Sequence, residues 1–215
     1  KQVKPEKFFY FSTDEVFGPA PEGVNYREED THNPTNPYSA TKSGAEMLCK
    51  SYKNCYGVPV VITRTMNAMG ERQHSEKYIP KVIHALLNGE KLVIHANPER
   101  TKAGTRFYIH SRNIASAYDF LLKKGEIGES YHIVGEREVD NLTLAKMIEK
   151  IVGKPLKYDM VDFHSSRPGH DLRYSLSGEK LAKCGWNVPK TFEESLERTV
   201  RWFMDNTKWL EVKSW

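Results

Sequence analysis

The sequence predicts an α/β fold built on a parallel β-sheet. Short runs of aromatic and β-branched residues alternate with longer segments of helical periodicity, which is the order of elements expected for such a sheet. Glycines follow the helical segments and mark their ends, at positions 57, 89, 125 and 153. Hydrophobic residues make up 39% of the 215 residues and charged residues 28%, so the chain has the balance of an ordinary globular protein with a core.

The elements follow from the pattern in chain order. A buried strand is expected at Phe8–Ser12, because an aromatic run ends there in polar residues. Residues 18–37 contain prolines, glycines and an acidic turn and are expected to form a loop. Further strands are expected at Val58–Arg64, Leu92–His95, Phe107–His110 and Tyr131–Val134. Helices are expected at residues 37–56 and at Lys77–Asn88, Ile114–Lys123, Leu142–Val152 and Glu193–Asn206.

The helix expected at residues 37–56 has the clearest ends. A proline stands at its start and a glycine lies just beyond its end, the positions that these residues favour. Ala45, Leu48, Cys49 and Tyr52 recur at helical spacing and form one apolar face.

Composition excludes several classes of protein. A net charge of +4 and a pI near 8.8 are too mild to predict a nucleic-acid partner, and no apolar run is long enough for a membrane span. Cys49, Cys55 and Cys184 have no metal-like spacing, and the first residues contain too short an apolar stretch for a secretory signal, so a reduced cytoplasmic protein is expected. No metal is expected, because His95 and His110 have no companion ligands.

The first candidate site lies at the end of the first strand, in the stretch FFYFSTDEVFG. Ligands of open α/β sheets bind outside the carboxyl ends of the strands, which is where Thr13, Asp14 and Glu15 stand. Two adjacent carboxylates repel each other, so one of them can serve as an acid and the other as a base. The alternative interpretation is that Ser12, Thr13 and Asp14 only cap a following turn.

The second candidate site is the pair Tyr38 and Lys42 in the segment YSATK. Residues four apart share a face of a helix, and a lysine ammonium near a phenol stabilises the phenolate. Tyr38 is therefore a candidate for moving a proton. The alternative is a tyrosine packed on its own helix.

One expected feature of a dinucleotide-binding fold is missing. Such a fold opens with a glycine-rich fingerprint after its first strand, whereas Gly125 and Gly128 follow a helix and have no third glycine. If the fold is of this kind, the chain holds the second mononucleotide-binding half and lacks the first.

Taken together, these motifs resemble the extended short-chain dehydrogenase/reductase superfamily, and within it the nucleotide-sugar 4,6-dehydratases that act on dTDP-glucose or UDP-glucose. The resemblance runs through nearly the whole chain. It is carried by the segments STDEVFG, NPYSATKSGAEML, EKYIPKVI, RFYIHSRN, RPGHDLRYSL and GWNVPKTFEESLERTVRWF.

The resemblance implies a fold and a division of the chain. The fold is the C-terminal part of a Rossmann-type parallel sheet plus a smaller mixed α/β substrate-binding domain. Residues 1–66 and 105–135 are expected to be the remnant of the NAD-binding domain, and residues 67–104 and 136–215 the nucleotide-sugar-binding domain. The missing NAD-binding half would leave Phe8–Ser12 and Val58–Thr63 at an exposed sheet edge.

The resemblance also implies a reaction, in which the cofactor NAD takes a hydride from C4 of the sugar and returns it to C6. Tyr38 removes the proton of the 4-hydroxyl, Lys42 stabilises the phenolate and bonds the nicotinamide ribose, and Thr13 bonds the same sugar oxygen. Glu15 removes the C5 proton and Asp14 donates a proton to the departing 6-hydroxyl. Tyr38, Lys42 and Ser12 are expected to contact NAD.

Substrate contacts are implied in the same way, and each of these residues could alternatively be an ordinary surface residue. Arg106, Arg167, His170 and Asn67 match residues that hold the diphosphate in the family. The other expected substrate-binding residues are Thr13, Lys77, Ile79, Pro80, Val93, His95 and Asn141.

The chain departs from the family pattern in three places. Ala68 and Met69 replace an asparagine and an aromatic residue, Arg112 and Asn113 replace acidic residues, and the loop at residues 96–104 is long. Alternative functions are a nucleotide-sugar 4-epimerase, a decarboxylase, or a non-catalytic nucleotide-sugar-binding fragment. A homodimer is expected for a full-length protein, with a helix at residues 37–56 in the interface. The sequence does not choose between thymidine and uridine nucleotides.

Overall fold

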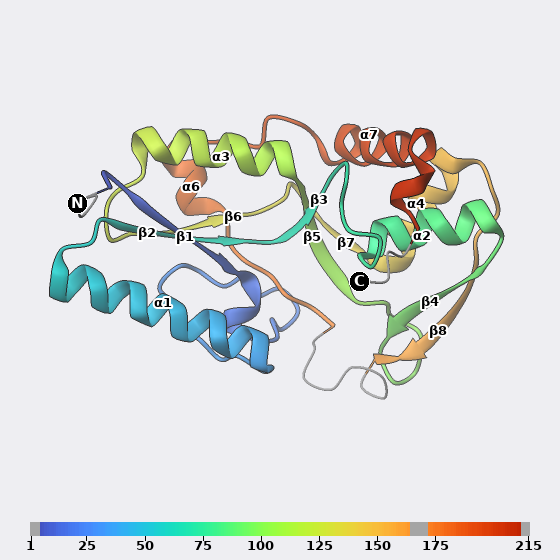
Figure 1. Cartoon of the computed structure of the whole chain (residues 1–215). Coiled ribbons are helices and arrows are strands. Elements are labelled where there is room, and N and C mark those ends of the chain that lie inside the picture. Colours follow the sequence, from blue (N-terminus) through green and yellow to red (C-terminus); the bar gives the residue numbers. More distant parts are fainter. Residues whose placement is uncertain (1–4, 164–171, 212–215) are drawn as a thin grey trace. The chain divides into compact units, whose positions relative to one another are not determined.

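The computed structural model describes residues 5–163 and 172–211, which form two compact units (Figure 1). Unit 1 comprises the described residues of Lys1–Met66, Asn113–Val134 and Gly169–Pro189. Unit 2 comprises those of Asn67–Arg112, Gly135–Pro168 and Lys190–Trp215. No helix in the described part of the chain has both the length and the apolar character to cross a membrane.

Unit 1 is built on a three-stranded parallel sheet in the order β1-β2-β6, with α1 on one side of the sheet and α3 on the other (Figure 1). The strands are β1 (Phe8–Thr13), β2 (Val60–Thr65) and β6 (Ser130–Ile133). The helices are η1 (Asp14–Phe17), α1 (Pro37–Tyr56), α3 (Ser111–Lys124) and α6 (Glu179–Lys183). Parallel strands flanked by helices on both faces confirm the predicted Rossmann-type architecture.

Only one of the two strands expected at an exposed edge lies there. β1 is an edge strand of the described sheet, and Phe8 and Phe11 are 44% and 57% exposed. The expectation was wrong for Val58–Thr63, because β2 lies between β1 and β6 and its Val60, Val61 and Ile62 are buried.

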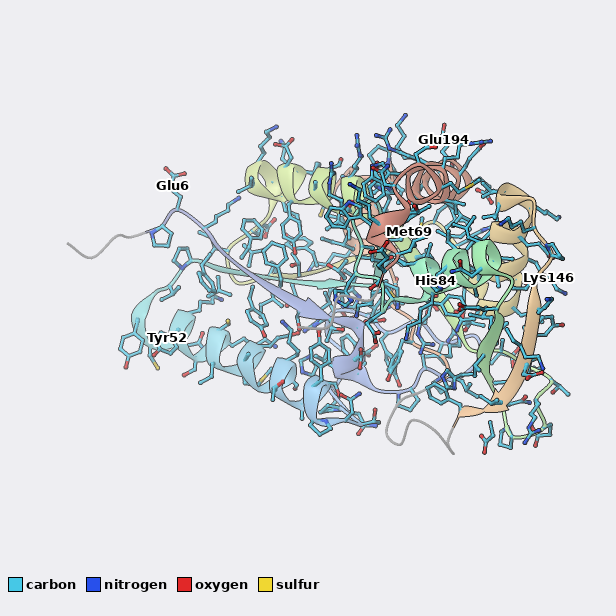
Figure 2. The ribbon with its side chains drawn as sticks, turned by 45° about the vertical axis from the view of Figure 1, so that its right-hand side comes forward. Glu6, Tyr52, Met69, His84, Lys146 and Glu194 are labelled. Atoms are coloured by element: carbon cyan, nitrogen blue, oxygen red, sulfur yellow. The ribbon has the colours of Figure 1, made fainter. Side chains whose placement is uncertain are left out.

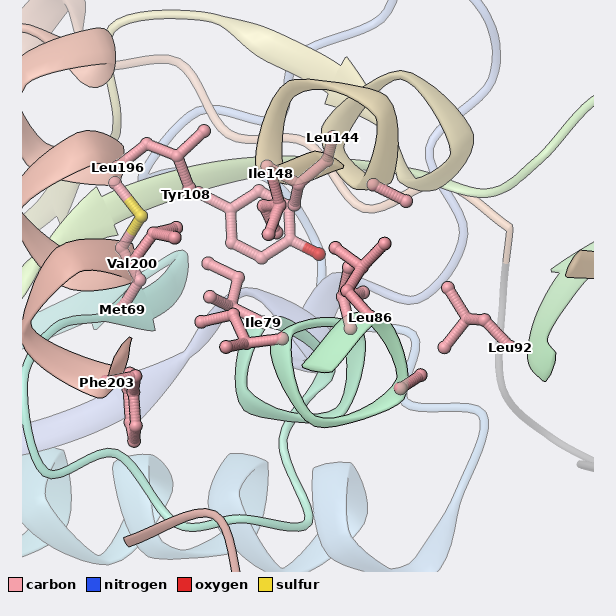
Figure 3. Close-up of a cluster of buried hydrophobic side chains, with 14 of the residues drawn as sticks. Met69, Ile79, Leu86, Leu92, Tyr108, Leu144, Ile148, Leu196, Val200 and Phe203 are labelled. Carbon is pink, nitrogen blue, oxygen red and sulfur yellow. The ribbon is translucent and has the colours of Figure 1, made fainter. Parts of the chain in front are cut away.

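Unit 2 contains a mixed sheet and a separate parallel strand pair. β3 (Asn67–Met69) is parallel to β5 (Thr105–His110), which is antiparallel to β7 (Glu138–Asp140). β4 (Lys91–Ala96) pairs with β8 (Lys157–Asp162). The helices are α2 (Tyr78–Asn88), α4 (Asn141–Val152), α7 (Phe192–Asp205) and η2 (Thr207–Trp209). Figure 3 shows the core that these elements share, with Ile79 of α2, Ile148 of α4 and Val200 of α7 meeting beside Tyr108 of β5.

The division into units differs from the predicted domain boundaries at two segments. Residues 105–112 belong to unit 2, because β5 pairs with β3 and β7 there. Residues 172–189 belong to unit 1, where Leu176 forms a bridge with Tyr26. The assignment of one part to NAD and the other to the nucleotide sugar stays a prediction.

The predicted helices and strands are present with ends shifted by a few residues, and three strands were missed. β3 and β7 have only three residues each, too few to show a period. β8 has the sequence KYDMVD, in which charged residues interrupt the apolar ones, and it exists because β4 pairs with it.

The apolar face predicted for α1 is only partly covered, with Ala45 and Cys49 half-buried. Leu48 and Tyr52 are 61% and 54% exposed, and Figure 2 labels Tyr52 on this helix. The buried residues of α1 are Ser39 and Glu46. The fully buried side chains of this helix are therefore polar, and hydrophobic periodicity does not detect them.

Gly18 follows η1 and has a positive φ, and the backbone of Asn33 lies close to it. Its φ is +71°, and an added Cβ would lie 2.3 Å from the carbonyl oxygen of Asn33. Gly23 has a similar φ of +78° but open space around it. We expect Gly23→Ala to cost about 1–2 kcal/mol from backbone strain alone, and Gly18→Ala to cost a further ~1–3 kcal/mol from the clash.

Urea unfolding of the two variants measures this difference directly. Equal losses of unfolding free energy in Gly18→Ala and Gly23→Ala would show that the approach of Asn33 to Gly18 is not tight.

Candidate active site at the end of strand β1

The residues predicted at the end of β1 form a compact hydrogen-bonded turn. Thr13 and Asp14 are buried and Glu15 is half-buried. Thr13 Oγ1 donates to Asp14 Oδ1 at 3.0 Å and accepts from the Glu15 backbone N–H at 3.4 Å, so Thr13 caps η1. The capping role was the alternative interpretation of this sequence. It is present, and it fixes the Asp14 side chain and the Glu15 backbone at the carboxyl end of the strand.

Asn36 ties this turn to the start of α1. Its side-chain Oδ1 accepts from the Ser39 backbone N–H at 2.9 Å, and Ser39 Oγ in turn accepts from the Asn36 N–H at 3.2 Å, which is a complete capping box. The same Asn36 side chain donates from Nδ2 to Glu15 Oε2 at 3.0 Å. One amide group therefore caps the helix and orients a candidate catalytic carboxylate. Sequence analysis missed Asn36, although an asparagine before Pro37 is a typical cap signal.

Lys42 makes a second connection between α1 and β1. Its Nζ donates to the carbonyl oxygen of Phe11 at 2.5 Å and lies 4.7 Å from the centre of the Tyr10 ring. The ammonium is thus held beside the end of β1, next to Ser12. Tyr38, one helical turn earlier, is 53% exposed. The two contacts bring the helix that carries Tyr38 and Lys42 to the strand end that carries Thr13, Asp14 and Glu15.

Ser12 supplies a further polar atom at this place. The residue is 9% exposed, and its Oγ is buried with no hydrogen-bond partner among the described residues. A buried hydroxyl without a partner is costly and needs an explanation, of which a bound ligand is one.

A buried ion pair joins the middle of α1 to strand β2. Arg64 of β2 and Glu46 of α1 are both 0% exposed, and Arg64 donates from Nη2 to Glu46 Oε2 at 2.7 Å and from Nε to Oε1 at 3.0 Å. Glu46 follows Lys42 by four residues, as Lys42 follows Tyr38. This spacing indicates that Glu46 shares a helix face with Tyr38 and Lys42. It does not indicate that Glu46 is buried, because a glutamate on a helix is usually exposed.

Two histidines accept further hydrogen bonds from Arg64. Its Nη1 donates to His132 Nε2 at 3.1 Å and its Nη2 to His32 Nε2 at 3.2 Å. Since these nitrogens accept, the protons lie on Nδ1, which faces Ser177 O in His132 and Ser43 Oγ in His32. Burial and the Arg64 charge lower the pKa of His132 to about 3, and burial lowers the pKa of His32. Both rings are neutral at pH 7.

The predicted substrate-binding residues of unit 2 lie in several environments. Lys77 precedes α2 and is exposed, whereas Ile79 and Pro80 are buried in that helix, with Ile79 in the hydrophobic core. Val93 on β4 is 52% exposed, and half-buried His95 on the same strand lies edge-on to Phe163.

The remaining predicted residues are placed as follows. Arg106 Nη1 donates to the Thr105 carbonyl oxygen at 2.6 Å, and Asn67 on β3 is exposed. Asn141 Oδ1 accepts from the hydroxyl of Tyr108 at 3.0 Å. Arg167 and His170 lie outside the described residues. The described part of the chain contains no cluster of side chains able to hold a metal ion.

Comparison with known proteins identifies the family. A model of the GDP-mannose 4,6 dehydratase family matches residues 1–199. The chain belongs to this family. Among its members, the trifunctional UDP-glucose 4,6-dehydratase/UDP-4-keto-6-deoxy-D-glucose 3,5-epimerase/UDP-4-keto-L-rhamnose-reductase of Arabidopsis thaliana is 39% identical over 205 residues, which are 94% of this chain and 30% of that protein.

Solved structures extend the comparison. A dTDP-glucose 4,6-dehydratase from Streptomyces venezuelae with NAD bound matches 96% of this chain and 63% of its own with a TM-score of 0.87 and 33% identity. The UDP-glucuronic acid 4-epimerase of Bacillus cereus, in complex with UDP-glucuronic acid and NAD, matches 95% of this chain and 63% of its own with a TM-score of 0.85 and 25% identity. The chain therefore spans less than two thirds of the length of these family proteins.

The buried ion pair gives a first prediction for this site. Glu46→Gln should lower the free energy of unfolding by about 3–5 kcal/mol, because it leaves the Arg64 charge buried without its counter-charge. Glu197→Gln, which breaks an exposed pair between Glu197 and Arg201, should cost less than about 1 kcal/mol. Urea unfolding at pH 7 measures both, and similar small losses would contradict the anchoring role of Arg64.

The neutral histidines give a second prediction, for the effect of pH. Because the pKa of His132 is about 3 in the folded chain against 6.5 for the free side chain, the unfolded state binds the proton first as the pH falls. The free energy of unfolding should therefore decrease by about 1 kcal/mol between pH 7 and pH 5.5 through this residue. His132→Gln should reduce that decrease, and an unchanged pH dependence in the variant would contradict the assignment.

Proposed function

We propose that this chain is part of a nucleotide-sugar 4,6-dehydratase, a lyase that uses NAD to convert a dTDP- or UDP-hexose to its 4-keto-6-deoxy form. The observation that carries the proposal is the pair of contacts, Asn36 to Glu15 and Lys42 to Phe11, that joins the start of α1 to the carboxylates after β1. They bring together a tyrosine-lysine pair and an aspartate-glutamate pair, and a dehydration coupled to redox needs both.

The residues at the end of β1 fit the nicotinamide ribose end of NAD. The buried Ser12 Oγ without a partner and the Lys42 ammonium beside Phe11 O supply a hydroxyl and a cation for the hydroxyls of a ribose. When bound, NAD supplies a hydride acceptor at C4 of the sugar and a hydride donor at C6. We assign Tyr38, Lys42 and Ser12 to its binding.

Tyr38 and Thr13 act on the 4-hydroxyl of the sugar in this proposal. Tyr38 removes the hydroxyl proton as the C4 hydrogen leaves, and the Lys42 charge favours the phenolate that does so. Tyr38 is 53% exposed, so its hydroxyl is accessible to a substrate. Thr13 Oγ1 has a fixed position through its bonds to Asp14 and Glu15.

Asp14 and Glu15 divide the elimination between them. Formation of the 4-ketone acidifies the C5 proton, and Glu15 removes it. Asp14 donates a proton to the 6-hydroxyl, which leaves as water. Glu15 is half-buried and accepts a hydrogen bond from Asn36, whereas Asp14 is 6% exposed and accepts one from Thr13. The two neighbouring carboxyl groups thus have different surroundings, and the proposal gives the acid role to Asp14 and the base role to Glu15.

We assign the nucleoside diphosphate to Arg106, Arg167, His170, Asn67, Lys77, Ile79, Pro80, Val93, His95 and Asn141. Cationic side chains in this set suit the diphosphate. The exposed Val93 offers an apolar surface to a base.

We further propose that the full-length protein is a cytoplasmic homodimer. Met47, Leu48, Tyr52 and Tyr56 on α1 are 45%, 61%, 54% and 76% exposed, an apolar surface that a second copy of the helix would cover. The three cysteines are free thiols, a state that persists in a reducing compartment.

Substitution of the proposed acid tests the function. With the protein in its full natural length, Asp14→Asn should lower the rate of 4-keto-6-deoxy sugar formation about 10²–10⁴-fold, the usual contribution of a general acid. Hydride removal at C4 should persist, because Tyr38 and Lys42 are intact. Mass analysis of the sugar and NADH absorbance after substrate addition follow the two steps.

Asp30→Asn is the matched control, since Asp30 is an exposed aspartate on the loop between η1 and α1. It should leave the rate unchanged. Unimpaired product formation by Asp14→Asn would refute the role of Asp14, and a 4-epimer as the product of the unsubstituted protein would replace the dehydratase by an epimerase.

A further inference from the structure

Unit 2 contains a cavity that the proposed reaction does not use. Its volume is about 260 Å³, and every residue that lines it belongs to unit 2. The lining residues are His110, Arg112, Lys190, Glu194, Ser195 and Arg198. They come from the end of β5, the start of α3 and the first turns of α7, and Figure 2 labels Glu194 on α7. Three of the six side chains are cationic and one is anionic.

Ser195 is the most telling of these residues. It is 3% exposed, and its Oγ is buried with no hydrogen-bond partner among the described residues. A serine hydroxyl inside a helix commonly bonds to a preceding backbone carbonyl, as Thr199 Oγ1 does with Ser195 O at 2.8 Å. The Ser195 hydroxyl makes no such bond among the described residues, and the residue belongs to the lining of the cavity. Rotation of its short side chain would turn the hydroxyl towards a ligand, to which it can donate.

The two arginines are fixed by one carboxylate that does not itself line the cavity. Glu71 Oε1 accepts from Arg198 Nε at 2.6 Å and from Arg112 Nη2 at 3.3 Å. Burial alone would raise the pKa of Glu71, but the bond from Arg198, a backbone hydrogen bond and the Arg112 charge outweigh it and lower the pKa to about 2. Glu71 is therefore ionised at pH 7. It uses one nitrogen of each guanidinium, so each arginine keeps further N–H donors.

His110 completes the arrangement. Its Nδ1 accepts from the Arg112 backbone N–H at 3.1 Å, so a neutral ring carries its proton on Nε2, 3.1 Å from Glu71 Oε2. The carboxylate is thus surrounded by His110, Arg112 and Arg198. Glu194 is the one anionic residue among the described residues of the lining, and its Oε2 accepts from the Thr191 N–H at 3.2 Å in the cap of α7.

We propose that this cavity binds a phosphate group, either inorganic phosphate or a small phosphate monoester, between Arg112, Arg198 and the Ser195 hydroxyl. Guanidinium groups and a hydroxyl donor are the side chains that hold phosphate oxygens best. The volume exceeds what a single phosphate fills, so a monoester with a short organic part fits as well. Glu71 holds the arginines in place and competes with the ligand for them.

The site is distinct from the one proposed for the substrate diphosphate. Arg106 and His110 both lie on β5, four residues apart, which corresponds to about 13 Å along a strand. Substitution of Arg106 therefore separates the two sites experimentally.

Isothermal titration calorimetry of the protein with inorganic phosphate, and separately with glycerol 2-phosphate, tests the proposal. Chloride replaces phosphate at equal ionic strength in the blank titration. We expect saturable binding with one site per chain that persists in Arg106→Gln. The ligand that binds more tightly identifies the free ion or the monoester as the better occupant.

Ser195→Ala is the sharpest variant, because it removes a buried hydroxyl for which the described part of the chain provides no hydrogen-bond partner. It should keep or raise the thermal stability and weaken phosphate binding about three- to tenfold, the effect of one hydrogen bond. Arg198→Gln should weaken binding more than about tenfold. Arg201→Gln, three residues later on the same helix and exposed, should leave binding unchanged.

Glu71→Gln has the opposite expected effect. Removal of the competing charge should tighten phosphate binding, whereas a purely structural role for the cluster predicts lower stability and no gain in affinity. Absence of saturable binding at millimolar phosphate would overturn the proposal. So would binding that Arg106→Gln abolishes and Ser195→Ala leaves intact, because the phosphate would then occupy the proposed substrate site.

Discussion

The candidate active site depends on the ion pair between Arg64 and Glu46. Both side chains are fully buried, so the pair is stable only because its geometry is bidentate and because His32, His132 and the Glu28 carbonyl oxygen accept the other donors of Arg64. The pair joins the central strand of the unit 1 sheet to the middle of α1. An apolar contact could hold the helix as firmly, but it would not fix the rotation of the helix about its axis.

That rotation decides where the functional side chains lie. Tyr38, Lys42 and Glu46 are four residues apart and share one face of α1, so the side that Glu46 turns towards the sheet also carries Lys42 to the end of β1. The same rotation leaves Leu48 and Tyr52 exposed on another side of the helix. One polar contact thus explains both the reach of Lys42 to Phe11 and the exposed apolar surface that we assign to a dimer.

Glu71 shows the same principle at a more accessible place. Like Glu46 it is a carboxylate surrounded by arginine and histidine, but Arg112 and Arg198 have side chains that are 61% and 55% exposed. Their charges remain available to a ligand, whereas the donors of Arg64 are all used inside the fold. Burial therefore separates a charge cluster that anchors a helix from one that can bind an anion.

Local sequence was enough to predict most helices and strands, the parallel sheet and the family, because periodicity, caps and the STDE and YSATK motifs are short-range signals. It was also enough to name Asp14, Glu15, Tyr38 and Lys42. Only the tertiary structure decided that Glu46 is buried, that Asn36 connects Glu15 to α1, and that Ser195 and Arg112 line the same cavity. These facts depend on contacts between residues far apart in the chain. The sequence around a polar residue does not indicate which distant residue will pair with it and allow its burial.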